Sequence, residues 1–157
     1  MLYNPLTGAK YPVGGMQLGM LSGQVKISTQ KEFDAFCTTY LAGTDGSNKA
    51  LLNLIIADAK AVGLEFLEYK STLTGGYRVA LVVWPHTDYH WYRDNGDGTW
   101  SHKPGQTAAT NLEVLGRNSD GTIKYGNVIT DPKDAGKKAN YTVFVGYFYI
   151  RPLGTIG

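Results

Sequence analysis

Two of the three histidines in this 157-residue sequence, His90 and His102, lie within thirteen positions of each other. Arg93 and Lys103 lie in the same stretch, beside two tryptophans. Histidine side chains exchange protons near neutral pH. Arginine and lysine beside aromatic rings bind anions and stack on planar groups. The residue types therefore indicate an acid–base site or a ligand-binding site.

We expect the ligand-binding residues to come from this one stretch. Positive charge beside aromatic faces favours an anionic ligand that contains a ring, such as a signalling nucleotide. The alternative is a hairpin whose aromatic cross-strand pairs only stabilise the sheet. The predicted ligand-binding residues are His90, Trp91, Tyr92, Arg93, Trp100, Ser101, His102 and Lys103.

The elements that must position these residues are two strands, 88–93 and 99–103, joined by a turn at 95–98. A loop of two or four residues places His90 on one face and His102 on the other, because side chains alternate along a strand. Trp100 then shares the His102 face with Trp91. Only a three-residue loop or a bulge would bring the histidines together.

The rest of the chain predicts an α+β fold, with two N-terminal helices packed on an antiparallel sheet. Thr29 and Glu32 have the spacing of a capping box, which predicts a helix start. A second helix is predicted from Ser47 to Val62. We interpret 1–157 as a single domain, with a glycine- and proline-rich arm at 1–23, a helical part at 24–63, and a β-meander at 64–157 that includes a long loop at 104–140.

Composition excludes several classes of protein. A net charge of +2 is too small to predict binding to a nucleic acid polymer, and no apolar run is long enough to span a membrane. The single cysteine excludes an internal disulfide and favours a reducing compartment. The first residues lack the pattern of a signal peptide. These observations predict a cytoplasmic protein of a bacterium or of an infected bacterial cell.

Cys37 and the histidines have side chains that are capable of covalent and metal chemistry. Cys37 could be a nucleophile with His90 as its base, but its place on an apolar helical stripe favours core packing. His86, Asp88 and His90 alternate along a strand and could bind an ion, although a good zinc site needs three or four ligands. The sequence has no phosphate-binding loop and no dinucleotide fingerprint. We therefore predict no metal and no cofactor.

The segment from Gly76 to Ile150 resembles a known family. The residues that carry the resemblance are the strings VALVVWPHTDYHWYRDNGDGTWSHKPGQTAATN, GNVITDP and YTVFVGYFYI. They are similar to a family of small bacterial and viral proteins associated with a papain-like cysteine hydrolase fold. The resemblance implies that His90 is a general base oriented by His102 or Ser101. It also implies an N-terminal cysteine nucleophile, where this chain has Leu2.

Because leucine cannot attack a carbonyl group, our first hypothesis is a nonenzymatic protein that keeps the hydrolase-like pocket. Its partner would be a small anionic ligand or a host protein, as for a phage-type protein that sequesters a nucleotide. One alternative is an active cysteine hydrolase that uses Cys37 and His90, with His102 in support. Another is a structural or assembly protein, and the chain could form a homo-oligomer.

Overall fold

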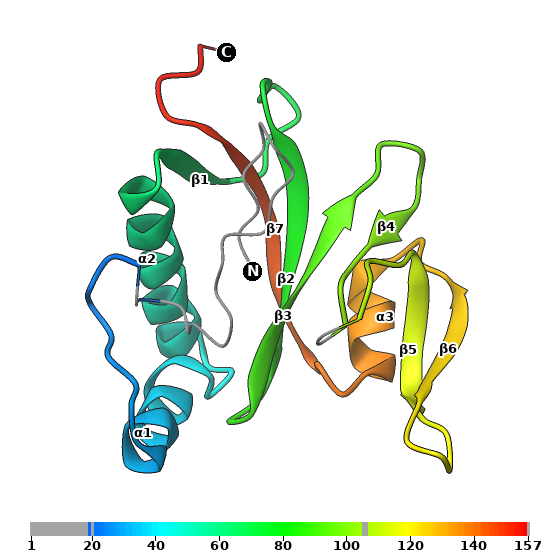
Figure 1. The fold of residues 1–157 in the computed structure, drawn as a ribbon. Coiled ribbons are helices and arrows are strands. Elements are labelled where there is room, and N and C mark those ends of the chain that lie inside the picture. The colour runs from blue at the N-terminus through cyan, green and yellow to red at the C-terminus, as the bar shows by residue number, and fades with distance from the viewer. Residues whose placement is uncertain (1–18, 20, 105–106, 157) are drawn as a thin grey trace.

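The computed structural model describes residues 19, 21–104 and 107–156. Nearly all of the predicted arm at 1–23 therefore lies outside the described residues, as does Leu2. The predicted α+β class is confirmed, with helices that precede an antiparallel sheet (Figure 1). The elements are α1 (Gln30–Tyr40), α2 (Asp45–Ala61), β1 (Leu64–Glu68), β2 (Tyr77–Trp84), β3 (Asp88–Asp94), β4 (Trp100–Ser101), β5 (Leu112–Arg117), β6 (Ile123–Val128), α3 (Pro132–Lys138) and β7 (Val143–Pro152).

Both N-terminal helices begin at threonine caps. The Thr29 hydroxyl accepts a hydrogen bond from the Glu32 amide at 3.1 Å, as the capping-box spacing predicts. The Thr44 hydroxyl accepts one from the Ser47 amide at 3.2 Å. Helix α2 therefore begins at Asp45, two residues before the predicted start, because Thr44 satisfies an amide of the first turn.

The main sheet has five antiparallel strands in the order β1-β7-β2-β3-β4. Strand β2 lies at its centre, and Val79 to Val83 are fully or almost fully buried. Val79, Leu81 and Val83 pack into the core beneath α1 and α2, whereas Ala80 and Val82 pack into a smaller core on the opposite face. A central strand that is covered on both faces requires such a continuous apolar run.

The segment at 104–140 is not the loop that the sequence predicted. It forms β5, β6 and α3, which cover the face of the sheet opposite α1 and α2 (Figure 1). Helix α3 begins at an Asp131 cap followed by Pro132, a residue that fits the first helical position. Buried Glu113 on β5 binds Lys138 on α3 at 2.7 Å, and this ion pair joins the hairpin to the helix. The prediction failed because the β5–β6 register is irregular, so the strands lack a clean alternation of apolar residues.

Two hairpin loops in the chain share one hydrogen-bonded design. In 95–99 and in 118–122, an asparagine amide binds a threonine hydroxyl, and an aspartate carboxylate binds the amide and hydroxyl of that threonine. The first loop pairs Arg93 with Ser101 and Asp94 with Trp100, so three residues, 96–98, lie between Asn95 and Thr99. Gly96 and Gly98 both have positive φ angles, +79° and +89°, which that loop requires.

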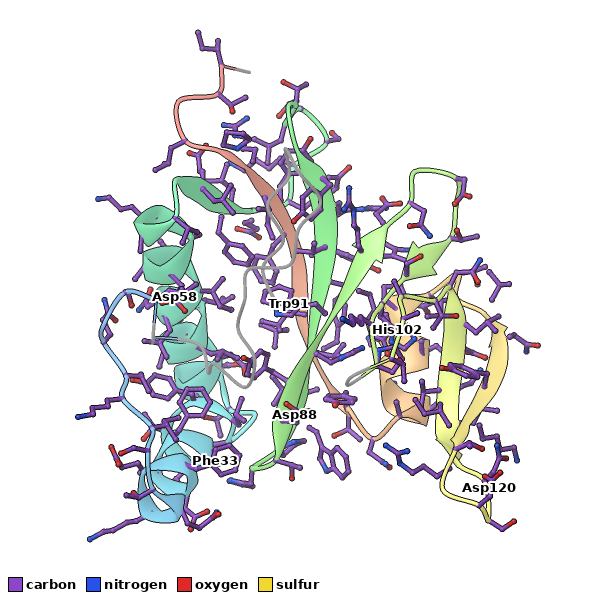
Figure 2. The ribbon with its side chains drawn as sticks, in the orientation of Figure 1. Phe33, Asp58, Asp88, Trp91, His102 and Asp120 are labelled. Atoms are coloured by element: carbon purple, nitrogen blue, oxygen red, sulfur yellow. The ribbon has the colours of Figure 1, made fainter. Side chains whose placement is uncertain are left out.

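Asp58 anchors the chain that precedes α1. Its carboxylate is buried in α2 (Figure 2) and accepts hydrogen bonds from the Gly19 amide at 2.6 Å and the Ser22 amide at 3.0 Å. A buried carboxylate must be satisfied by donors of this kind. The contact holds Gly19 and Ser22 against the second helix.

Candidate functional site

The three-residue loop brings His90 and His102 to the same face of the sheet. His90 Nε2 lies 2.8 Å from His102 Nδ1. The His102 ring also stacks on the buried ring of Tyr92, with centroids 4.9 Å apart. The prediction that the histidines face opposite sides is therefore wrong, because it assumed a loop of two or four residues.

A backbone carbonyl fixes the protonation pattern of the histidine pair. His102 Nε2 lies 2.8 Å from the Leu112 carbonyl oxygen, which can only accept a hydrogen bond, so His102 Nε2 donates. In a neutral ring His102 Nδ1 must then accept, and His90 Nε2 is its donor. This assignment leaves His90 Nδ1 as an unprotonated acceptor.

Burial keeps the pair neutral. It lowers the pKa of His90 well below the ordinary value, and the nearby His102 ring lowers the pKa further. Burial also lowers the pKa of His102, although its hydrogen bond to the Leu112 carbonyl acts in the opposite direction. Burial raises the pKa values of Tyr92 and Tyr141, so both phenols stay protonated. The site therefore has a polar but uncharged floor at neutral pH.

The histidine pair lies in a half-open pocket of about 960 Å³. The pocket is enclosed by β3, the β5–β6 hairpin and the connection from α3 to β7. In Figure 2, His102 lies on the β5–β6 side of the sheet and Asp120 at the tip of the hairpin. The lining residues are Trp84, Asp88, His90, Tyr92, His102, Pro104, Thr107, Val114, Gly116, Arg117, Thr122, Ile123, Tyr125, Ala139, Asn140 and Tyr141.

Two aromatic residues predicted for the site are core residues instead. Trp91 is buried on the face of the sheet that α1 and α2 cover (Figure 2). It packs edge-on against Phe66, with ring centroids 5.8 Å apart. Trp100 is buried beneath the guanidinium of Arg78, whose carbon lies 5.0 Å from the ring centroid. Neither tryptophan lines the pocket. Trp91 follows His90 along β3 and therefore faces the opposite side of the sheet, whereas Trp100 shares the face of His102 but packs into the smaller core.

The cations predicted for an anionic ligand also lie outside the pocket lining. The Arg93 guanidinium stacks on Tyr77 at 4.1 Å, and Tyr77 belongs to the helix-side core. Ser101 pairs with Arg93 across the strands, and its hydroxyl accepts a hydrogen bond from the Asn95 side chain. Lys103 is half-buried but does not line the pocket. Of the eight predicted ligand-binding residues, His90, Tyr92 and His102 contribute to it.

Cys37 and His90 lie on opposite faces of the sheet. Cys37 is buried in the core beneath α1 and α2. His90 pairs with Val82 and shares the face of the smaller core. Burial raises the pKa of the Cys37 thiol, with Asp34 and Asp88 adding to the effect, so the reactive thiolate is disfavoured. The alternative of a Cys37–His90 catalytic pair is therefore wrong.

Sequence reasoning missed most of the pocket wall. Tyr141 donates a hydrogen bond to the Asp88 carboxylate at 2.8 Å across 53 positions of sequence. Trp84 and Tyr125 are 38% and 41% exposed and also line the pocket. No local pattern marks such long-range contacts. The repeated Asn-x-Asp-Gly-Thr pattern at 95–99 and 118–122 was the usable signal, because it indicates a second hairpin.

The part of the chain that the structure describes shows neither a cluster of metal ligands nor a membrane-spanning helix. Within residues 19, 21–104 and 107–156, there is no group of at least three His, Cys, Asp or Glu side chains that could hold a metal ion. His86 lies in the turn between β2 and β3 with a φ angle of +61°. Within the same residues, no helix combines the length and the apolar character that a membrane span requires.

The fold and the site define an α+β chain with a half-open pocket around a neutral histidine pair. No family model matches the sequence, and no solved structure matches it either. The papain-like arrangement therefore stays a prediction. Among curated proteins, the chain is 43% identical over 74 residues to "Insoluble matrix shell protein 1" of Ruditapes philippinarum. The match covers 47% of this chain and 43% of that protein, so the chain spans less than half of its relative.

This match corrects two of the predictions. A relative named as an insoluble protein of a shell matrix points to a structural protein, not to a phage-type protein that sequesters a nucleotide. That relative is named as a shell matrix protein, which contradicts the predicted cytoplasmic location. The pocket also lacks the two cations that were predicted to bind a nucleotide, because Arg93 and Lys103 do not line it.

Proposed function

We propose that this chain is a structural protein that assembles into an insoluble extracellular matrix. The observation that carries the proposal is the 43% identity over 74 residues to an insoluble matrix shell protein. Identity at this level over such a length supports a common fold for the matched part. The matched part is less than half of either protein, so the assembly of this chain is a proposal.

The architecture is compatible with a structural role. The one cysteine and the histidine pair lie on opposite faces of the sheet, so Cys37 cannot serve as a nucleophile for His90. The folded chain is also tied together by long-range contacts, among them Arg151 with Glu65 at 2.9 Å and Asp58 with Gly19. Such hydrogen bonds and ion pairs between segments distant in the sequence oppose local unfolding, as a structural protein requires.

Sedimentation velocity of the purified chain over a wide range of concentration tests the proposal. We expect species larger than a monomer that grow with concentration and finally pellet. Far-UV circular dichroism of the pelleted material should match that of the soluble chain, because assembly of the folded protein preserves its helices and sheet. A pellet with altered spectra would be aggregate of unfolded chain and would contradict the proposal, as would a strict monomer at every concentration.

Location is tested separately in the organism that makes the protein. Antibodies raised against the folded chain should label the insoluble extracellular fraction. Labelling confined to the cytosol would overturn the extracellular part of the proposal.

A further inference from the structure

Among the described residues, the two charged side chains that line the pocket, Asp88 and Arg117, have opposite signs, and each already has a hydrogen-bond partner. The Arg117 guanidinium donates to the Gly121 carbonyl at 2.8 Å within its own hairpin. The Asp88 carboxylate accepts hydrogen bonds from the Tyr141 hydroxyl and the Tyr89 amide, each at 2.8 Å. The histidine pair is neutral, as described above. The chemistry of the pocket therefore favours an uncharged ligand.

Aromatic rings form part of the pocket wall. Trp84 and Tyr125 are exposed, although large aromatic side chains are usually buried. Trp84 meets Tyr141 edge-on with ring centroids 5.8 Å apart, and Tyr141 lies 5.3 Å from His90. The rings of Trp84, Tyr125 and Tyr141 come from β2, β6 and the connection from α3 to β7, and they offer flat apolar surface to a ligand.

Two further hydrogen-bonding groups of the pocket, on His90 and Asn140, are neutral. The tautomer set by the Leu112 carbonyl leaves His90 Nδ1 as an acceptor. The Asn140 side chain also lines the pocket, and no side-chain hydrogen bond from it to another described residue is seen. An amide both donates and accepts. Together these groups match hydroxyl groups, which also do both.

We propose that this pocket is a binding site for a neutral saccharide, with sugar rings stacked on Trp84 and Tyr125 and hydroxyl groups bonded to His90 and Asn140. A sugar ring has apolar C–H faces for the aromatic rings and hydroxyl groups at its edge. The volume of about 960 Å³ is at the upper end of the usual range for small-molecule sites, so more than one ring fits. This inference does not depend on self-assembly of the chain.

Isothermal titration calorimetry of the full chain tests the inference. The neutral probes are cellotriose, maltotriose and triacetylchitotriose, and the anionic probes are inorganic phosphate and AMP. We expect at least one neutral trisaccharide to bind and neither anion to bind. Trp84→Ala and Tyr125→Ala should each weaken binding about tenfold, as loss of a stacked aromatic contact does.

The chain offers a matched control on the same hairpin. Leu115 is 41% exposed, as Tyr125 is, but its side chain lies by Gly126 on the other side of the hairpin and does not line the pocket. Leu115→Ala should leave binding unchanged. No binding of any neutral probe, tighter binding of an anion, or equal effects of Tyr125→Ala and Leu115→Ala would each overturn the inference.

The outcome is separable from the assembly proposal. Sugar binding by a chain that stays monomeric would support the saccharide site and contradict assembly. Assembly without sugar binding would do the reverse.

Discussion

His90 Nε2 and His102 Nδ1 form a direct hydrogen bond of 2.8 Å. The other ring nitrogen of His102, Nε2, donates a second hydrogen bond of 2.8 Å to the Leu112 carbonyl. The chain of contacts joins β3, the residue after β4, and the first residue of β5. It therefore attaches the β5–β6 hairpin to the main sheet through two side chains. The charge state of the pair should control that attachment.

The first prediction concerns acid stability. Burial lowers the pKa values of His90 and His102 in the folded chain, so below about pH 6.5 the unfolded chain binds more protons. The free energy of unfolding should then decrease as the pH falls below about 6.5, by up to about 1.4 kcal/mol per pH unit for each histidine. Urea unfolding between about pH 7.5 and pH 5 measures the slope.

Two variants decide whether the pair is the cause. The double variant His90→Gln with His102→Gln should flatten the slope. His86→Asn, at an exposed histidine outside the pair, should leave it unchanged, since asparagine tolerates the positive φ angle there. An equal slope in the wild type and the double variant would rule out the pair as the acid-sensitive element.

The second prediction concerns the reactivity of Cys37. Its thiol is buried and its pKa is raised, so iodoacetamide should label it only when the chain unfolds. The labelling rate in native buffer should be slow and the same in wild type and His90→Ala, because the sheet separates the two residues. Mass spectrometry follows the labelling. Fast labelling that depends on His90 would contradict the opposite-face arrangement.

The third prediction concerns the loop that sets the β3–β4 register. Gly98 has a φ angle of +89°, a conformation that costs an alanine about 1 to 2 kcal/mol. Gly98→Ala should lower the free energy of unfolding by about that amount in urea titrations. Gly46→Ala is the control, because Gly46 lies in α2 with open space around it and no positive φ angle. Destabilisation by both changes alike would argue against the loop conformation as the cause.

The fourth prediction concerns the anchor at Asp58. Asp58→Ala leaves the Gly19 and Ser22 amides without their acceptor and should lower the free energy of unfolding by about 1 to 3 kcal/mol. Trypsin should also cleave faster after Lys26, close to the released turn. The exposed Glu68 provides the control, and Glu68→Ala should change stability by less than about 0.5 kcal/mol. Unchanged cleavage in Asp58→Ala would show that the turn is held by other contacts.

The sequence was sufficient for elements whose signals are local. The Thr29 cap, the central strand at 77–84 and the order of helices before strands were all read from patterns of a few residues. The hairpin at 95–98 was also found, but not its loop length. That single unit of loop length decides which side chains of the two strands share a face, so the error placed the two histidines apart.

The rest of the pocket depends on contacts that no local pattern encodes. Asp88 meets Tyr141, and His102 meets a main-chain oxygen at Leu112. The residue types at these positions do not reveal which residue each side chain contacts, or whether the contact is to a side chain or to the main chain. The irregular β5–β6 register removed the alternation that would have marked those strands.

The bond from His102 to the Leu112 carbonyl has a consequence for sequence divergence. Every amino acid supplies the same carbonyl oxygen, so position 112 can be substituted without loss of the acceptor. Two backbone hydrogen bonds hold Thr110 opposite His102, so an insertion or deletion between Thr110 and Leu112 would move that oxygen and break the bond. Relatives that keep the histidine pair should therefore vary in residue type at position 112 but conserve the number of residues between 110 and 112.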